Sequence, residues 1–167
     1  MARQRKAVWW VLVGLALGLL VERGFHPGGI FRPAPKPGDG WRVVERVVDG
    51  DTIDLDGGER VRLIGVDTPE LHHPNKPVEY FAREAAEFTR RLCLGKRVRL
   101  EYDQQDEDRY HRTLAYVYLE DGTFVNAEII RQGYGFAYTR YPFAHLEEFR
   151  ALEREAREAR RGLWARE

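Results

Sequence analysis

RVVERVVDGDTIDLDGGERVRLIGV, residues 42–66, is the part of this chain that indicates its fold class most clearly. It contains three strand-like runs, at 42–49, 51–56 and 60–66, and apolar residues alternate with polar ones in the second and third runs. The sequence Asp-Gly-Gly at 56–58 separates these two runs and supplies the backbone conformations of a tight hairpin. We therefore expect a meander of three antiparallel strands.

The rest of the chain is expected to add two strands and three helices to this meander. The expected elements are a helix at 80–94 ended by a left-handed turn at Gly95, strands at 96–102 and 114–120, a short helix at 126–132 capped by Asn126, and a last helix at about 144–161. This order of strands and helices predicts an α+β protein. A five-stranded Greek-key β-barrel of the oligonucleotide/oligosaccharide-binding kind, the OB-fold, is the best candidate for it.

The composition is that of an ordinary globular protein, because 43% of the 167 residues are hydrophobic and 32% are charged. The net charge is zero, but residues 1–23 carry four cations and one anion, which leaves a net charge of −3 on residues 24–167. A domain of this charge lacks the broad positive field needed to coat DNA, so contact with nucleic acid requires a local cluster. The single cysteine, Cys93, excludes an internal disulfide, and we expect it to be buried.

The beginning of the chain is typical of a signal or a membrane anchor. Residues 7–21, AVWWVLVGLALGLLV, carry no charge and follow the basic MARQRK. As a helix they would span about 22 Å, which is shorter than a hydrocarbon core of roughly 30 Å and suits a secretory signal. The absence of a clear A-x-A cleavage site favours an uncleaved anchor instead, and a buried core helix is a third interpretation.

These features divide the chain into three parts. Residues 1–23 are expected to form the signal or anchor helix, and residues 24–40, rich in proline and glycine, a linker. Residues 41–167 are then the globular domain. Because basic residues remain in the cytoplasm, the domain is expected to be extracytoplasmic, held at the membrane through residues 7–21 or secreted.

Acidic residues gather at two strand ends of the meander. VVDGDTIDL contains Asp49 and Asp51, and RLIGVDTPE contains Asp67 and Glu70. Each cluster by itself could be a turn, because turns favour Asp, Gly and Pro. The hairpin should bring the clusters together, so we expect Asp51, Asp67 and Glu70 to converge around a cation. Carboxylate ligands of this kind suit Ca²⁺ or Mg²⁺.

Two arginines are expected to face the same rim of the barrel. Arg62 points opposite to its apolar neighbours on the third strand, and Arg112 lies in the loop before the fifth strand. A guanidinium group binds phosphate through two parallel hydrogen bonds. A metal ion, two arginines and Glu70 as base would promote the attack of water on a phosphodiester. Alternatively, the arginines pair with surface carboxylates.

The stretches VVDGDTI, VRLIGVDTPE, DRYHRTLAYVY, VNAEIIRQG and RRGLW, in this order, resemble the staphylococcal nuclease (thermonuclease) family over about residues 41–164. The resemblance implies a calcium-dependent endonuclease on an OB barrel that cleaves DNA and RNA and leaves 3′-phosphate ends. It implies one calcium ion held by Asp51, Asp67 and the carbonyl group of Thr68. Asp49 would lie next to these ligands without binding the ion itself.

The same resemblance assigns roles to the other site residues. Glu70 is similar to the general base of the family, and Arg62 and Arg112 to its catalytic phosphate-binding arginines. Arg109 and Tyr110 are similar to residues that contact a terminal phosphate. Tyr138 is similar to an aromatic residue that stacks on a base. Such stacking favours single-stranded substrates. A monomer is expected.

The chain also departs from the family pattern. His111 stands where the pattern has a glycine before Arg112, and only four lysines accompany 23 arginines. A catalytically inactive OB-fold module that binds single-stranded nucleic acid is therefore the alternative hypothesis. A glycosidase that uses Asp51 and Glu70 as its carboxylate pair is a third hypothesis, but it leaves both arginines without a role.

Overall fold

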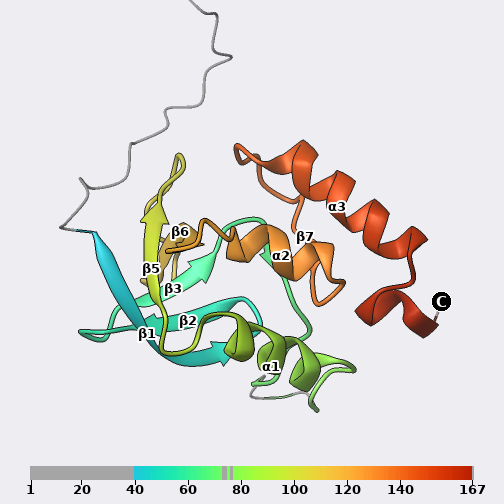
Figure 1. Ribbon diagram of the computed structural model, residues 1–167, viewed down its shortest axis with the longest axis horizontal. Coiled ribbons are helices and arrows are strands. Elements are labelled where there is room, and N and C mark those ends of the chain that lie inside the picture. Colours follow the sequence, from blue (N-terminus) through green and yellow to red (C-terminus); the bar gives the residue numbers. More distant parts are fainter. Residues whose placement is uncertain (1–39, 73–74, 76, 167) are drawn as a thin grey trace, which may run out of the picture.

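The computed structural model describes residues 40–72, 75 and 77–166 (Figure 1). The predicted signal or anchor at 1–23 lies outside the described residues, as does the predicted linker except for Gly40. In the described part of the chain, no helix is long and apolar enough to span a membrane.

Five strands form a closed barrel in the order β1-β2-β3-β6-β5 (Figure 1). They are β1 (Trp41–Asp49), β2 (Thr52–Leu55), β3 (Arg60–Leu63), β5 (Arg97–Glu101) and β6 (Thr113–Leu119). The pairs are antiparallel except for β3 with β6, which is parallel, and β1 closes the barrel by pairing with both β2 and β5. The last barrel strand thus lies between the third and the fourth, as in the Greek-key barrel that the sequence predicts.

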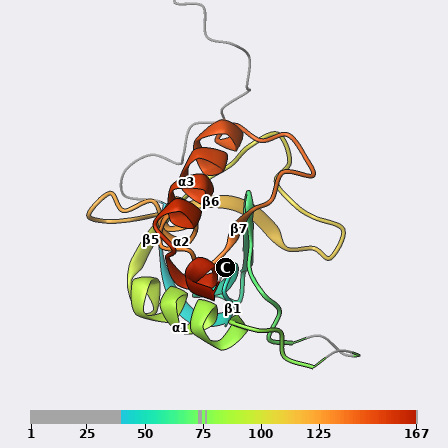
Figure 2. The same cartoon turned by 90° about the vertical axis from the view of Figure 1, so that its right-hand side faces the viewer.

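Three α-helices pack around the barrel, as predicted. They are α1 (Ala82–Cys93), α2 (Val125–Arg131) and α3 (Leu146–Glu158), followed by a 3₁₀ helix, η1 (Gly162–Arg166). In Figure 1 α2 lies between the barrel and α3, and α1 runs beside β1; Figure 2, seen from the side of α3, shows α3 in front of α2. Apolar side chains inside the barrel, among them Ile53, Leu63 and Val117, are completely buried together with Ile129 of α2 and Phe149 of α3. Burial of each such side chain contributes about 1.5–3 kcal/mol.

Several boundaries differ from the prediction. The third strand ends at Leu63 rather than at Val66, because Gly65 adopts a left-handed conformation (φ 74°) and breaks the run. Val66 then begins a two-residue strand, β4 (Val66–Asp67), which pairs with β7 (Phe136–Ala137) in a second small sheet that the sequence analysis did not predict. The last helix ends at Glu158, before η1.

The prediction that Asn126 caps α2 is wrong. Phe124 precedes the helix, and the completely buried Asn126 lies in its first turn. Its side-chain oxygen accepts a hydrogen bond from the Val117 N–H (2.9 Å), and its amide nitrogen donates to the Ile64 carbonyl group (3.0 Å). The side chain therefore satisfies backbone groups of the barrel, which cost free energy when they are buried without partners. Two smaller predictions are confirmed: Gly95 has a left-handed φ of 72°, and Cys93 is buried.

Candidate active site

The turn between β1 and β2 is packed tightly on both sides. A β-carbon on the buried Gly50 would lie 2.7 Å from Oγ1 of Thr68, so only glycine fits there without a shift of Thr68. On the other side, the hydroxyl of the buried Thr89 on α1 donates a hydrogen bond to the Gly50 carbonyl group (2.6 Å). The turn that carries Asp49 and Asp51 is thus held between the exit of β4 and α1.

Asp51 is 5% exposed and has a hydrogen-bond donor on each carboxylate oxygen. Its Oδ2 accepts from the backbone N–H (3.0 Å) and the hydroxyl (3.1 Å) of Thr68, and its Oδ1 accepts from the Thr52 hydroxyl (3.0 Å). These bonds fix the position of the carboxylate. They join the first acidic cluster to the second across the hairpin.

Arg62 lies between the carboxylates of the two clusters. Its Nη1 is 2.9 Å from Oδ2 of Asp51 and donates to the Val66 carbonyl group (2.7 Å), while its Nη2 is 3.5 Å from Oδ1 of Asp67. The Arg62 side chain is 15% exposed and that of Asp67 is 47% exposed. The contact to Asp67 is long for an ion pair, so this end of the guanidinium group is held less firmly than the end at Asp51.

Glu70 is the second acidic residue of the second cluster and lies beside Asp49. The Glu70 N–H donates to the Glu79 carboxylate (3.0 Å), and the Glu79 N–H donates to the Glu70 carbonyl group (3.1 Å). Burial raises the pKa of Glu70, and the negative charges of Asp49 and Asp51 raise it further. Asp49 accepts hydrogen bonds from the N–H groups of Gly50 (3.0 Å) and Leu71 (3.3 Å).

The site has an excess of negative charge. Burial also raises the pKa of Asp49 and of Asp67, in each case assisted by the charge of Asp51, while Arg62 lowers the pKa of Asp67. Closely spaced carboxylates of this kind are stabilised by a cation, and hard oxygen ligands match Ca²⁺ or Mg²⁺. The chemistry of the donors therefore fits a divalent ion.

The expected convergence of three carboxylates needs a correction. Within residues 40–72, 75 and 77–166, no group of three or more Asp, Glu, His or Cys side chains is arranged to hold a metal ion. Asp51 and Asp67 flank Arg62, but Glu70 interacts mainly with Asp49. Two carboxylates and the carbonyl group of Thr68 thus remain as the predicted ligands, and their role as ligands stays a prediction.

Arg112 lies in the loop between β5 and β6 and is paired with Asp108. Oδ2 of Asp108 is 2.7 Å from both Nε and Nη2 of Arg112. Leu114, two residues after Arg112, pairs in register with Arg62, so the backbone at Arg112 lies near the end of β3. In the described residues no direct contact joins Arg112 to the acidic clusters.

The same loop carries the other predicted phosphate-binding residues. Tyr110 is 62% exposed, and the guanidinium groups of Arg109 and Arg112 lie 4.7 and 5.5 Å from the centre of its ring. His111 adopts a left-handed conformation (φ 61°), and its Nδ1 is 2.6 Å from the Glu107 carboxylate. The loop thus has the backbone conformation that favours glycine, although a histidine occupies the position.

Tyr138 lies next to the acidic clusters because β7 pairs with β4. Asp67 is in register with Phe136, and the Tyr138 N–H donates to the Gly65 carbonyl group (2.9 Å). Its half-buried ring is 6.0 Å from the ring of Tyr141, which is 61% exposed. The small sheet therefore brings this aromatic residue to the acidic clusters from a distant part of the sequence.

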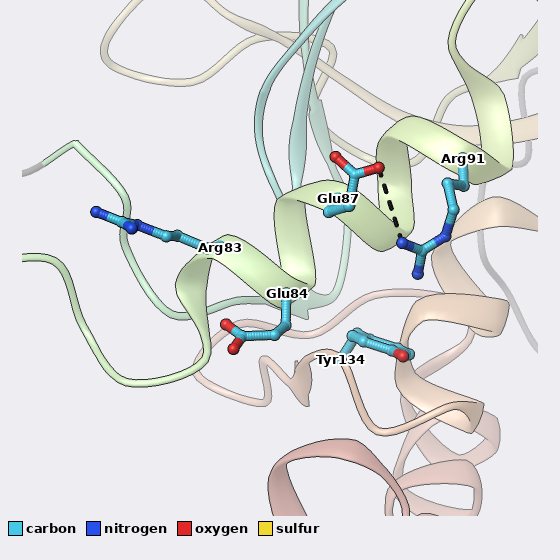
Figure 3. A pocket seen from close by; sticks show the side chains of 5 residues that line it. All are labelled: Arg83, Glu84, Glu87, Arg91 and Tyr134. Carbon is cyan, nitrogen blue, oxygen red and sulfur yellow. Dashed lines mark ion pairs between the residues drawn. The ribbon is translucent and has the colours of Figure 1, made fainter.

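A separate pocket of about 330 Å³ lies along α1 (Figure 3). Arg83, Glu84, Glu87, Arg91 and Tyr134 line it. The side chains of Glu87 and Arg91 form an ion pair of 3.7 Å there, shown as a dashed line in Figure 3. None of the residues predicted for catalysis or metal binding lines this pocket.

Three residues of the site region were missed by the sequence analysis. They are Glu79, which binds the backbone of Glu70, Thr89, which binds the D-G-D turn, and Asp108, which binds Arg112. Asp108 stands four residues before Arg112, a spacing that could have indicated an ion pair. The contacts of Glu79 and Thr89 depend on chain folding and have no local signal.

Comparisons with known proteins show which proteins the chain is similar to. A family model described as "Staphylococcal nuclease homologue" matches residues 60–166. The chain is 42% identical to a thermonuclease of Staphylococcus hyicus over 159 residues, which cover 92% of this chain and 91% of the relative. It is 38% identical to a thermonuclease of Staphylococcus intermedius over 165 residues, 93% of this chain and 95% of the relative. It is also 31% identical over 148 residues to endonuclease YhcR of Bacillus subtilis (strain 168), covering 80% of this chain and 12% of that protein.

Proposed function

The chain belongs to the staphylococcal nuclease family and is a nuclease, and we propose that it is a calcium-dependent endonuclease acting on DNA and RNA. The observation that carries the proposal is the arrangement of Asp51 and Asp67 on two sides of Arg62, beside Glu70 with its raised pKa. One metal ion per chain would be bound by Asp51, Asp67 and the carbonyl group of Thr68. Asp49 would lie next to these ligands without binding the ion itself.

In this proposal Glu70 acts as the general base. It takes a proton from a water molecule whose oxygen attacks the phosphorus atom. The bond from phosphorus to the 5′ oxygen breaks, and this oxygen takes a proton from solvent, which gives a 5′-hydroxyl end and a 3′-phosphate end. A base works best when its pKa approaches the working pH, and burial and the nearby carboxylates raise the pKa of Glu70 in that direction. The calcium ion would supply positive charge to the phosphate.

Arg62 and Arg112 would stabilise the negative charge that develops on the phosphate oxygens. Each guanidinium group keeps N–H donors beyond those used by its carboxylate partner, because it has five donors in all. For Arg62 the weakly held end is the Nη2 group, 3.5 Å from Asp67. A hydrogen bond that forms fully only with the developing charge increases kcat rather than the affinity for substrate.

The parts of the substrate next to the scissile phosphate would be bound outside this centre. Arg109 and Tyr110 would contact a neighbouring phosphate, and Tyr138 would stack on a base of a single strand. The exposed Tyr110 ring and the position of Tyr138 beside β4 support these roles. We further propose that the protein works as a monomer outside the cytoplasm, exported or anchored through residues 7–21.

The proposal is tested with the purified full-length protein and single-stranded DNA and RNA. Cleavage should require Ca²⁺, stop with a chelator and leave 3′-phosphate ends. Glu70→Gln should lower kcat by about 100-fold or more, since a general base contributes about 10²–10⁴-fold. Glu155→Gln, a change of an exposed residue on α3, should leave kcat unchanged. Binding of single strands without cleavage at any Ca²⁺ concentration would instead support the inactive OB-fold module.

A further inference from the structure

Asp108 is the centre of the loop that carries Arg112. One of its carboxylate oxygens, Oδ1, accepts hydrogen bonds from the N–H groups of Tyr110 (2.8 Å) and Arg112 (3.1 Å). The other, Oδ2, contacts Nε and Nη2 of Arg112, both at 2.7 Å. The backbone adds two bonds, from the Asp108 N–H to the Arg112 carbonyl group and from the His111 N–H to the Asp108 carbonyl group. One side chain thus fixes both the backbone and the guanidinium group of Arg112.

The contacts with Asp108 use only one edge of the guanidinium group. Nε and one N–H of Nη2 face Asp108, whereas the edge formed by Nη1 and the second N–H of Nη2 is left for another acceptor. In the part of the chain that the structure describes, Asp108 is the only ion-pair partner of Arg112. The free edge is the pair of parallel donors that matches two oxygens of a phosphate.

We propose that Asp108 is a positioning residue for the nuclease reaction: it fixes the guanidinium group of Arg112 so that the free edge binds the scissile phosphate. This inference rests on the proposed function. It deepens that function, because Asp108 would act through Arg112 without touching the substrate. Orientation of a catalytic group before the reaction removes a cost in entropy from the catalysed step.

The opposite interpretation is that Asp108 competes with phosphate for Arg112. The geometry speaks against it, because Asp108 is held by two backbone N–H groups and does not depend on Arg112 alone. Hydrogen bonds from Arg112 and Tyr110 also lower the pKa of Asp108 despite its partial burial, so it stays charged. A phosphate can reach the free edge without displacing Asp108.

The hydrogen bonds of Asp108 also account for the histidine before Arg112. His111 has a left-handed φ of 61°, and its ring is paired with Glu107. A left-handed conformation is unfavourable for a residue with a β-carbon, and the hydrogen bonds across the loop can offset this cost. The loop therefore keeps its shape with a side chain at this position.

The test is a double-mutant cycle in the full-length protein. Asp108→Asn replaces one carboxylate oxygen with an NH₂ group, which is unable to accept a hydrogen bond, and it removes the negative charge that pairs with Arg112. We expect kcat to fall by about 10- to 100-fold with KM changed by less than about threefold. In an Arg112→Ala background, the same change should alter kcat by less than about twofold, because the group that it positions is gone.

Asp54→Asn is the matched control. Asp54 also binds the Nε of an arginine, Arg60 (2.7 Å), and its side chain is 14% exposed against 16% for Asp108. Urea unfolding should show a similar loss of stability for both changes, but only Asp108→Asn should lower kcat.

Three results would overturn the inference. They are a rise in kcat for Asp108→Asn, an equal loss of kcat in the Arg112→Ala background, and an equal loss for Asp54→Asn. Failure of the proposed function is distinguishable, because the native protein itself would then show no cleavage, which would reject both.

Discussion

Replacement of Thr89 by valine tests whether α1 holds the D-G-D turn in place. Thr89 is completely buried, and its hydroxyl donates to the Gly50 carbonyl group at 2.6 Å. Valine has nearly the same shape but no donor, so a buried carbonyl group would lose its partner. Such a loss costs about 1–3 kcal/mol, which for a chain of this size lowers Tm by about 2–12 °C.

Serine at the same position provides the control. Thr89→Ser keeps the hydroxyl and removes one buried methyl group, which costs about 0.5–1.5 kcal/mol through lost packing. Urea unfolding and DNA cleavage should be measured for both variants. We expect the valine variant to be the less stable and to lose about tenfold in kcat, because the turn carries Asp51 and a small shift of a catalytic constellation is costly. The serine variant should keep native activity.

One pattern of results would show that the hydrogen bond of Thr89 does not hold the turn. If the serine variant were the less stable and both variants cleaved DNA at the native rate, the contribution of Thr89 would come from packing. The turn would then not depend on its hydrogen bond to α1.

Three further predictions concern the same region. Gly50→Ala should destabilise the protein by about 1–3 kcal/mol in urea unfolding, because the β-carbon of the alanine would lie 2.7 Å from Oγ1 of Thr68. A variant as stable as the native protein would contradict the tight packing of this turn. Burial raises the pKa of Cys93 to about 12, so its thiol should not react with a disulfide reagent at pH 8 unless urea is added, and rapid labelling without urea would show the assignment wrong. The pKa values of Asp49 and Glu70 are raised above their ordinary 3.8 and 4.5. The metal-free native state therefore binds more protons than the unfolded chain. Its free energy of unfolding should fall as the pH rises through the raised pKa values. In Glu70→Gln this fall should be smaller, and an identical pH profile would refute the shift.

Much of the fold follows from local patterns in the sequence. Alternation of apolar and polar residues locates β2 and β3, and the Asp-Gly-Gly turn at 56–58 defines their antiparallel pairing. Gly95, which has a positive φ, follows the end of α1 as expected. These signals are local, because each depends on a few neighbouring residues.

The parts that were missed depend on contacts between distant segments. Asn126 looks like a helix cap in the sequence, but buried backbone groups near Val117 and Ile64 bind its side chain instead. The strands β4 and β7 have two residues each, too few for a periodic pattern, and they exist because the chain brings them together.

In the candidate site, too, some features follow from local sequence motifs and others depend on contacts that the motifs do not define. The motifs place Asp51, Asp67 and Arg62 in one cluster, and the structure brings them within ion-pair distance. Whether Glu70 faces those carboxylates or Asp49 depends on side-chain directions, which the spacing of residues does not define. The structure shows it beside Asp49.

A calcium titration of the full-length protein by isothermal calorimetry tests whether Asp51 and Asp67 hold a metal ion. We expect the native chain to bind one Ca²⁺, and we expect Asp51→Asn and Asp67→Asn each to abolish or strongly weaken this binding, while Asp54→Asn leaves it unchanged. Native binding that persists in both site variants, or no binding by the native chain, would contradict a calcium site between these two carboxylates.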